Sequence, residues 1–301
     1  MKIRNLMMVG ALVLALLFSL CACGGDSGST STNTPDIPDD TDAYEYEVEV
    51  VGAELFTDSD NRDAIRIYYD FTNNSEETKS PLMALTINAQ QGGADLEMTF
   101  AAYDETVAES GLFAMGVRPG VSIRCAEEYV LDPNGGVVTL TIGRGWLDET
   151  PMVVELDPTA LSMPTDEFVL ETIEDPAWTD ELDDKGLVND VYEMYIDNAE
   201  IVENSDGNEV LRVYLDFTNN SDEAQSFFAA CSTIAYQDGV QLEADYSVNS
   251  VEEDADYSVE IEPGETIRVT RCFALRSNSE VEVEVFDDMG MTVLGTSYTL
   301  E

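Results

Sequence analysis

The sequence predicts an all-β protein with two tandem β-sandwiches that follow a signal peptide and a flexible stalk. Three observations support this fold class. The chain repeats itself at an offset of 146 residues, both copies contain short segments in which apolar and polar residues alternate, and neither copy shows a convincing amphipathic helix. Alternation with a period of two is typical of a half-buried strand.

Residues 1–22 have the composition of a bacterial secretion signal. Two basic residues precede the apolar run Leu6–Leu20, which is too short to span a bilayer comfortably. The next residues, Leu20-Cys21-Ala22-Cys23, resemble the lipoprotein signal that is cut before a cysteine carrying a diacylglycerol. Because Ala22 supplies the small residue before the cut, we assign the lipid to Cys23. The alternative is an ordinary signal peptide that contains two cysteines.

Residues 23–43 are expected to form the lipidated cysteine and a disordered stalk. Gly, Ser, Thr, Pro and Asp dominate this segment, which has too few apolar residues to offset the entropy lost on ordering. Such a composition is typical of a spacer. The predicted location is the extracellular face of the cell membrane, with the lipid on Cys23 as the anchor.

An internal duplication defines the two domains. Tyr46–Thr99 aligns with Tyr192–Asp245 without a gap, and 22 of the 54 positions are identical. The centre of the match is DFTNNS, at 70–75 and again at 216–221, and a second block aligns 118–124 with 262–268. We therefore predict domains at 44–157 and 190–301, joined by an acidic linker at 158–189. Apolar linker residues are candidates to dock on a sandwich: Phe168, Val169, Leu170 and Trp178.

Each copy is expected to contain seven short strands separated by polar turns. In the first copy we place them at 46–56, 64–72, 80–90, 94–100, 121–131, 136–142 and 151–156. Seven short strands in a domain of this length predict an immunoglobulin-like β-sandwich. Another small β-barrel is the alternative.

Two segments of the second copy carry a family resemblance. VLRVYLDFTNNSDEAQSF at 210–227 and AYQDGVQLE at 235–243 resemble an uncharacterised immunoglobulin-like domain of Gram-positive cell-surface lipoproteins. That domain-of-unknown-function family is related to secreted domains of the immunoprotective-antigen type. The resemblance implies the fold, a surface location and a lipoprotein context, and it implies no activity.

The charge balance excludes several function classes. The chain has 62 acidic residues, 13 basic residues and no histidine, for a net charge of −49. Nucleic acid is therefore an unsuitable partner, and catalysis or zinc binding through histidine is excluded. We expect no enzyme and no cofactor, and a monomer, because both domains are acidic. Catalysis by paired carboxylates, as in a hydrolase, is the remote alternative.

Two turns are candidates for a calcium site, because hard cations take oxygen ligands from loops of this kind. An ordinary hairpin turn uses the same residue types, and we favour it. The candidate ligands in the two copies are Asp58, Asp60, Asp63, Asn204, Asp206, Asn208 and Glu209.

The polar faces of the two central strands are a second candidate site. They could form a ligand platform or cross-strand ion pairs that cover an exposed sheet, and we favour the ion pairs. The residues are Arg66, Tyr68 and Asp70 in the first copy and Arg212, Tyr214 and Asp216 in the second.

Three cysteines remain after Cys21 and Cys23. Cys231 and Cys272 lie on two predicted strands of the second domain, and export permits a disulfide between them. The first copy has Leu85 and Glu128 at these positions, so the fold does not require that bond. Cys125 is expected to be a buried apolar residue.

These observations predict a non-catalytic binding or display module for an extracellular protein, glycan or peptide. The alternative is a structural or stress-related envelope protein without a specific ligand. A binding module should expose apolar or aromatic patches on its sandwiches, whereas a spacer should expose uniformly acidic faces.

Overall fold

The computed structural model describes residues 44–102, 107–145, 148–166, 168, 182–189, 191–248, 251, 253 and 257–300. Residues Ala43–Glu301 form one compact unit. The predicted signal peptide, Cys23 and stalk lie outside the described residues. No helix in the described ranges is both long enough and apolar enough to cross a bilayer.

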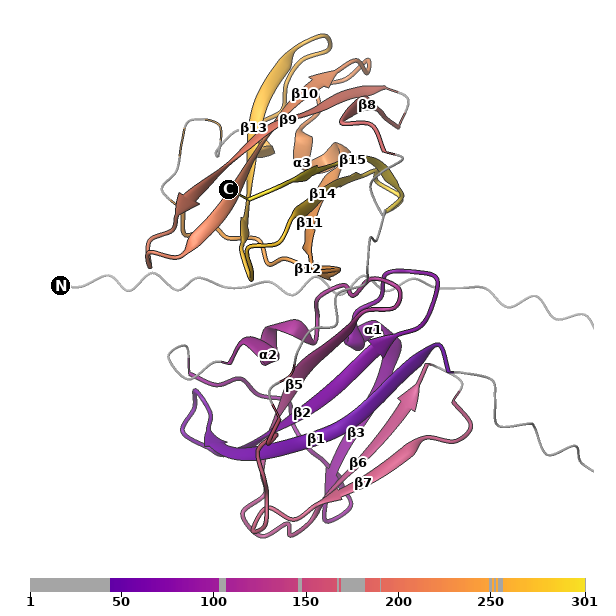
Figure 1. Ribbon diagram of the computed structural model, residues 1–301, viewed down its shortest axis with the longest axis vertical. Helices are drawn as coiled ribbons and strands as arrows, with labels where there is room; N and C mark the ends of the chain where they lie inside the picture. Colours follow the sequence, from indigo (N-terminus) through magenta and orange to yellow (C-terminus); the bar gives the residue numbers. More distant parts are fainter. Residues whose placement is uncertain are drawn as a thin grey trace, which may run out of the picture. The chain divides into compact units, whose positions relative to one another are not determined.

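Repeat 1, the first of the two copies, is a sandwich of two antiparallel sheets that are formed by β1 to β7 (Figure 1). The first sheet has the order β1 (Tyr46–Thr57), β2 (Asp63–Asn73), β5 (Ser122–Val130). The second has the order β4 (Ala94–Asp95), β3 (Leu85–Gln91), β6 (Val138–Arg144), β7 (Met152–Leu156). Two short helices, α1 (Pro81–Ala84) and α2 (Ala108–Leu112), lie in the connections.

Repeat 2 has the same arrangement with one additional strand. Its first sheet has the order β13 (Thr266–Ala274), β10 (Glu209–Asn219), β9 (Tyr192–Glu203), β8 (Lys185–Val188). Its second has the order β12 (Val240–Gln241), β11 (Ser232–Gln237), β14 (Val281–Phe286), β15 (Thr292–Tyr298). Helix α3 (Phe227–Ala230) corresponds to α1.

The connections follow the immunoglobulin-like Greek key. In repeat 1 the chain passes from β2 to the opposite sheet at β3, returns at β5 and crosses again to β6. Two separate sheets also exclude the alternative of a closed barrel. The predicted fold class, two tandem all-β sandwiches, is therefore confirmed.

Alternating apolar residues form the core of each sandwich. Ile65, Ile67, Tyr69 and Phe71 of β2 are completely buried, and so are the corresponding residues of β10 or nearly so. Burial of one such side chain contributes about 1.5 to 3 kcal/mol relative to an exposed position. Cys125 is also buried in the core, as predicted.

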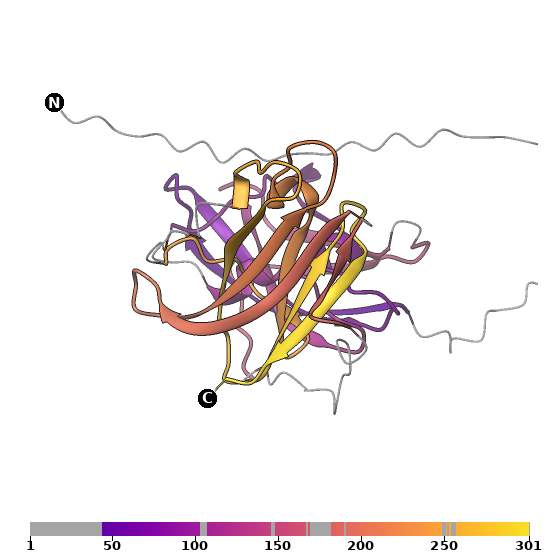
Figure 2. The ribbon, with the colours of Figure 1, turned by 90° about the horizontal axis from the view of Figure 1, so that it is seen from above.

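Both repeats carry a β-bulge at the same place in their first strand. The register of β1 against β2 skips Val51, and the register of β9 against β10 skips Asp197. A bulge adds a residue to one strand and bends it. The bend of β9 is visible in Figure 2. Since the two bulges align, they belong to the repeated framework.

A buried asparagine explains the identity of the DFTNNS segment. Asn73 donates through Nδ2 to the carbonyls of Glu77 (2.8 Å) and Val117 (2.7 Å), and its Oδ1 accepts from the amide and hydroxyl of Ser75. Asn219 makes the equivalent four contacts in repeat 2. One side chain thus satisfies the turn after β2 and the segment that leads into β5.

Two predicted strands differ from the structure. The predicted strand at 80–90 begins with α1, since Pro81 stands at the start of this helical turn, and only Leu85–Gln91 is extended. The predicted strand at 94–100 pairs with β3 only at Ala94–Asp95. The chain then crosses to the other sheet, where the Thr99 amide donates to the carbonyl of Glu128.

The predicted linker at 158–189 is corrected at both of its ends. Residues 185–188 form β8, which pairs with β9. At the other end, the Ala53 amide in β1 donates to the carbonyl of Ser162 (2.9 Å). Pro164 lies so close to Gly52 that a side chain there would collide with it. Phe168 lies against the Arg124 guanidinium, whereas Val169, Leu170 and Trp178 are outside the described residues.

The β11–β12 turn of repeat 2 contacts repeat 1 within the compact unit. Val117 forms a bridge with Val240, which is completely buried in the core of repeat 1. Arg118 contacts Glu282 (2.7 Å) and Glu284 (2.6 Å). The ring of Tyr236 stacks on the Arg118 guanidinium, with 4.0 Å between the ring centroid and Arg118 Cζ.

We expect Asn219→Ala to lower the free energy of unfolding by about 2 to 4 kcal/mol, because it leaves two carbonyls without a donor. Chemical denaturation measures this change. Asn220→Ala is the matched control, since Asn220 is exposed in the same turn, and it should cost less than about 0.5 kcal/mol. Equal effects of the two substitutions would contradict the assigned role.

Candidate functional site

The polar face of β2 is a closed network in repeat 1. Arg66 is buried and contacts Glu128 through Nε (2.7 Å) and Glu54 through Nη1 (2.6 Å). The Tyr68 hydroxyl donates to the same Glu54 oxygen (2.8 Å). The two carboxylate oxygens of Asp70 each accept a hydrogen bond from the Arg124 guanidinium. These groups satisfy one another across three strands.

The corresponding face of repeat 2 has the same pattern. Tyr214 donates to Glu200 (2.7 Å), Arg212 contacts the same oxygen, and Arg268 holds Asp216 through Nε (2.8 Å). Arg212 is buried, whereas Tyr214 and Asp216 are partly exposed. The geometry of both copies supports the interpretation as cross-strand ion pairs, not as an open ligand platform.

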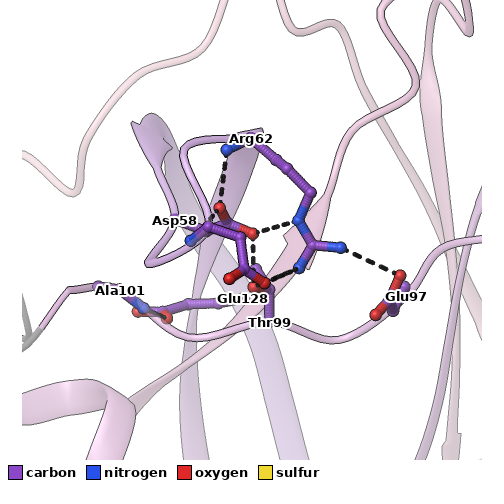
Figure 3. Close-up of polar contacts among 7 residues, drawn as sticks. Asp58, Arg62, Glu97, Thr99, Ala101 and Glu128 are labelled. Carbon is purple, nitrogen blue, oxygen red and sulfur yellow. Dashed lines mark hydrogen bonds and ion pairs between the residues drawn. The ribbon is translucent and has the colours of Figure 1, made fainter.

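Asp58, the first calcium candidate, directs its carboxylate inward. Its Oδ1 accepts from the amides of Asp60 and Arg62, and its Oδ2 accepts from Arg62 Nε (2.7 Å) and the Thr99 hydroxyl (2.8 Å). Figure 3 shows Arg62 between Asp58 and Glu97. Burial alone would raise the pKa of Asp58, but these hydrogen bonds outweigh it and lower the pKa to about 2.

In the equivalent turn of repeat 2, the donor and the acceptor of this hydrogen bond are exchanged. Asn204 accepts two amides of its own turn through Oδ1 and donates through Nδ2 to Asp245 (2.9 Å), the position of Thr99. The other candidate ligands, Asp60, Asp63, Asp206, Asn208 and Glu209, are exposed. Within the described ranges, no three Asp, Glu or Cys side chains are arranged to hold a metal ion. The geometry favours a hydrogen-bonded turn.

The candidate disulfide between Cys231 and Cys272 is not formed in the structure. The sheet itself separates them. Cys231 is buried in the core of repeat 2, whereas Cys272 precedes the core residue Phe273 and pairs with Arg212 on the outer face of the sheet. The sheet formed by β13, β10, β9 and β8 therefore lies between the two side chains, with Cys231 on its core side and Cys272 on its outer side.

Large apolar side chains are exposed at aligned positions of the two repeats. Leu82 of α1 is 52% exposed, and the corresponding Phe228 of α3 is 71% exposed. Phe100 and the corresponding Tyr246 are 73% and 77% exposed. These positions follow the same elements in each copy, so the exposure is a property of the repeat and not a single surface accident.

In repeat 1 this region contains a pocket of about 520 Å³, here named the edge pocket. It lies where the chain crosses from β4 to β5. Its apolar walls include Leu82, Met83, Leu85, Met98 and Phe113. Its polar lining includes Glu127, Tyr129 and Asp95, and no Lys or Arg is among the described residues that line it. The size is within the range of small-ligand sites.

Glu127 is a buried carboxylate in this pocket. It is 7% exposed, and Oε2 accepts from the Tyr129 hydroxyl (2.8 Å). Burial raises the pKa of Glu127 to about 7, although the hydrogen bond from Tyr129 acts to lower it. Because the folded state holds the proton more tightly, ionisation of Glu127 costs on the order of 3 kcal/mol of stability as pH rises from about 4.5 through 7.

A second tyrosine lies beside this carboxylate. Burial first, and then the negative charge of Glu127, raise the pKa of Tyr69 well above its ordinary value. The Tyr69 hydroxyl is buried beside Glu127 and, like that of Tyr129, acts to lower the pKa of this acid. The Tyr69 ring also packs against Phe113 of the pocket wall, with 6.3 Å between the centroids.

Repeat 2 has an aromatic cluster at the equivalent place. The Arg271 guanidinium lies 5.9 Å from the ring centroid of Tyr246 and 5.6 Å from that of Tyr257. Phe228 meets Tyr257 edge-on at 6.1 Å. Arg271 occupies the position of Glu127, so the two copies carry opposite charges at one site.

The sequence contained a signal for this site that the candidate residues did not include. Residues 123, 125, 127 and 129 alternate onto the core face of β5, so Glu127 is an acid in an apolar series. Arg271 occupies the same place in the series of β13. A charge on the apolar face of a strand in both copies marks a site, although its partners come from other strands.

We expect calcium to raise the midpoint of thermal unfolding no more than magnesium does, because the Arg62 guanidinium and backbone amides already occupy Asp58. The measurement compares the two ions on the fragment Ala43–Glu301 at fixed ionic strength. A rise that is selective for calcium, and is lost in the double variant Asp60→Ala and Asp206→Ala, would contradict this expectation.

Comparison with known proteins agrees with the duplication. The model of the family described as "Domain of unknown function (DUF5067)" matches residues 26–142 and 171–287. No curated protein shows significant similarity. One solved structure, titled "Structure of a putative lipoprotein from Staphylococcus aureus subsp. aureus NCTC 8325", is 16% identical, with a TM-score of 0.33, and the match covers 39% of this chain and 88% of that one. Since the family model matches each repeat once, the chain belongs to the DUF5067 family and contains two copies of its domain.

Proposed function

We propose that this protein is a non-catalytic binding module, held outside the cell by a lipid on Cys23, that recognises an extracellular protein or peptide. The observation that carries the proposal is the exposure of large apolar side chains at aligned positions of both repeats. Leu82 and Phe100 in repeat 1 correspond to Phe228 and Tyr246 in repeat 2. Single exposed apolar residues are ordinary, but repeated and clustered ones mark interaction sites.

The surroundings of these residues support binding. In repeat 1 Leu82 lines the edge pocket, and in repeat 2 Phe228 and Tyr246 belong to the aromatic cluster around Arg271. Aromatic side chains supply contact area at a low cost in conformational entropy, and both aromatic and methionine side chains are enriched in binding surfaces. The rival function, an envelope protein without a ligand, gives no reason for a strongly acidic chain to keep these side chains exposed.

Display explains the remaining features. The lipid fixes the chain to the membrane, the stalk at 23–43 sets its reach, and two related domains offer two sites on one chain. Two linked sites can bind a partner with two epitopes more tightly than either site alone. The absence of histidine from the sequence and the self-contained ion pairs of the polar faces support a role without catalysis.

A random-peptide library tests the binding role. We expect selection on the fragment Ala43–Glu301 to yield peptides that bind the protein and lose roughly tenfold or more of their affinity in the double variant Leu82→Ser and Phe228→Ser. Both positions are exposed, so the variant should keep its thermal midpoint. Isothermal titration calorimetry measures the affinities.

Val153→Ser is the matched control, because Val153 is 61% exposed on β7, outside both clusters. It should leave peptide binding unchanged. If no selected peptide depends on Leu82 or Phe228, the proposed role fails. A glycan array is run in parallel. Binding to a sugar on this array, without binding to any peptide, would also contradict the proposed recognition of a peptide.

We expect Cys23→Ser to abolish incorporation of labelled fatty acid and to remove the protein from the membrane fraction, because no other group then carries the lipid. Metabolic labelling in a Gram-positive host, followed by fractionation, measures both effects. Cys21→Ser is the matched control and should retain the label. Loss of the label in Cys21→Ser alone would move the anchor to that residue.

A further inference from the structure

The duplication provides an internal control for the Glu127 site. At the three aligned positions, Glu127, Tyr129 and Tyr69 of repeat 1 correspond to Arg271, Phe273 and Leu215 of repeat 2. Repeat 2 forms the same pair of sheets without these groups. The buried carboxylate and its tyrosines are therefore not needed to build the sandwich, and Glu127 in its charged form destabilises it.

The chemistry of the edge pocket selects the charge of its ligand. Its walls are made largely of Leu, Met and Phe side chains, while two carboxylates, Glu127 and Asp95, face the same space without a basic residue in the lining. Glu127 has a hydrogen bond from Tyr129 but no guanidinium or ammonium partner in the lining, unlike the arginine-bound Glu128 beside it. The group that complements this pocket is a cation attached to an apolar body.

We propose that the edge pocket of repeat 1 binds an apolar peptide segment that carries a protonated amine, with the amine donating to the Glu127 carboxylate. This inference rests on the proposed binding function and names the chemistry that one of its two sites recognises. The apolar side chains of the segment pack on Leu82, Met83 and Met98, which are all at least half exposed. A lysine side chain has the apolar length and the charged end that this arrangement requires.

The two tyrosines complete the site. Tyr129 donates to one oxygen of Glu127, and Tyr69 also acts on this carboxylate. Because a carboxylate has about four acceptor sites, sites remain for the amine. The hydroxyl of Tyr69 is buried beside this carboxylate and acts, like Tyr129, to favour its charged form. In repeat 2 the guanidinium of Arg271 occupies the aligned position and would repel the same ligand, so the two copies do not share one specificity.

The test compares two peptides that differ only in the amine. Acetyl-Leu-Lys-Leu-amide carries the ammonium, and acetyl-Leu-norleucine-Leu-amide replaces the lysine with an uncharged side chain of similar length. We expect the lysine peptide to bind the fragment Ala43–Glu301 roughly tenfold more tightly at pH 8, since only its ammonium forms a charge-assisted hydrogen bond with Glu127. A comparison of the affinities for hexylamine and hexanol shows whether the protein also prefers an amine that is not part of a peptide.

Glu127→Gln should abolish the preference for the lysine peptide and leave the norleucine peptide bound as before. Arg271→Gln is the matched control at the aligned position of repeat 2 and should keep the preference. Thermal midpoints establish that both variants fold. Equal affinity of the two peptides for the unmodified protein, or an unchanged preference in Glu127→Gln, would overturn the inference. Library peptides that still depend on Leu82 and Phe228 would then leave the general binding role intact.

The affinity for the lysine peptide should also rise between pH 6 and pH 8, because the pKa of Glu127 is raised to about 7 and the ammonium binds the ionised carboxylate. The other titratable groups near Glu127 are Tyr69 on β2, Tyr129 and Cys125 on β5, and Asp95 on β4. The first three keep their protons over this range because burial raises their pKa values, and hydrogen bonds from Gln90 and Asn88 lower the pKa of Asp95. The norleucine peptide should show no such rise.

Discussion

Burial of arginine between carboxylates is the interaction on which the first sheet of repeat 1 depends, and repeat 2 keeps a more exposed form of it. A chain with 62 acidic and 13 basic residues must bring acids together when its strands pair, and each buried arginine makes one such place tolerable. Arg66 joins acids from the two strands beside its own, and Arg124 holds Asp70 on the neighbouring strand. Loss of Arg66 would leave the buried Glu128 without its ion pair, which typically costs about 3 to 5 kcal/mol.

This constraint also explains why the polar faces were a misleading candidate site. The shared Arg, Tyr and Asp of β2 and β10 are kept because they neutralise the sheet, and their donors and acceptors face one another. Conserving such a network between two copies requires only that both copies fold. Binding residues, in contrast, are free to diverge, and the Glu127 and Arg271 positions differ in charge.

The sequence allowed prediction of the elements that depend on local pattern. The duplication, the alternating strands and the buried Cys125 follow from spacing alone, and the structure confirms them. The Glu127 site depends on strand register, since Tyr69 and Cys125 are paired across β2 and β5 and bring the second tyrosine near the acid. No local pattern contains that information.

The two turns show how far a contact can change while its role is kept. Asp58 accepts from Thr99 in repeat 1, whereas Asn204 donates to Asp245 in repeat 2. Donor and acceptor are exchanged, but the turn is tied to the same crossing segment. A sequence alignment places Asp58 opposite Asn204 and therefore suggests a shared ligand set. The alignment does not show which partner donates the hydrogen bond.

Both ends of the segment between the repeats cover the outer edge of a first strand, Ser162 at β1 and β8 at β9. An uncovered edge presents free amides and carbonyls to any other extended chain, and it is a common starting point for aggregation. By pairing with β9, β8 blocks one route by which two copies of this chain would pair. A fragment cut at residue 190 would lose that protection, so repeat 2 is better isolated with Lys185–Val188 attached.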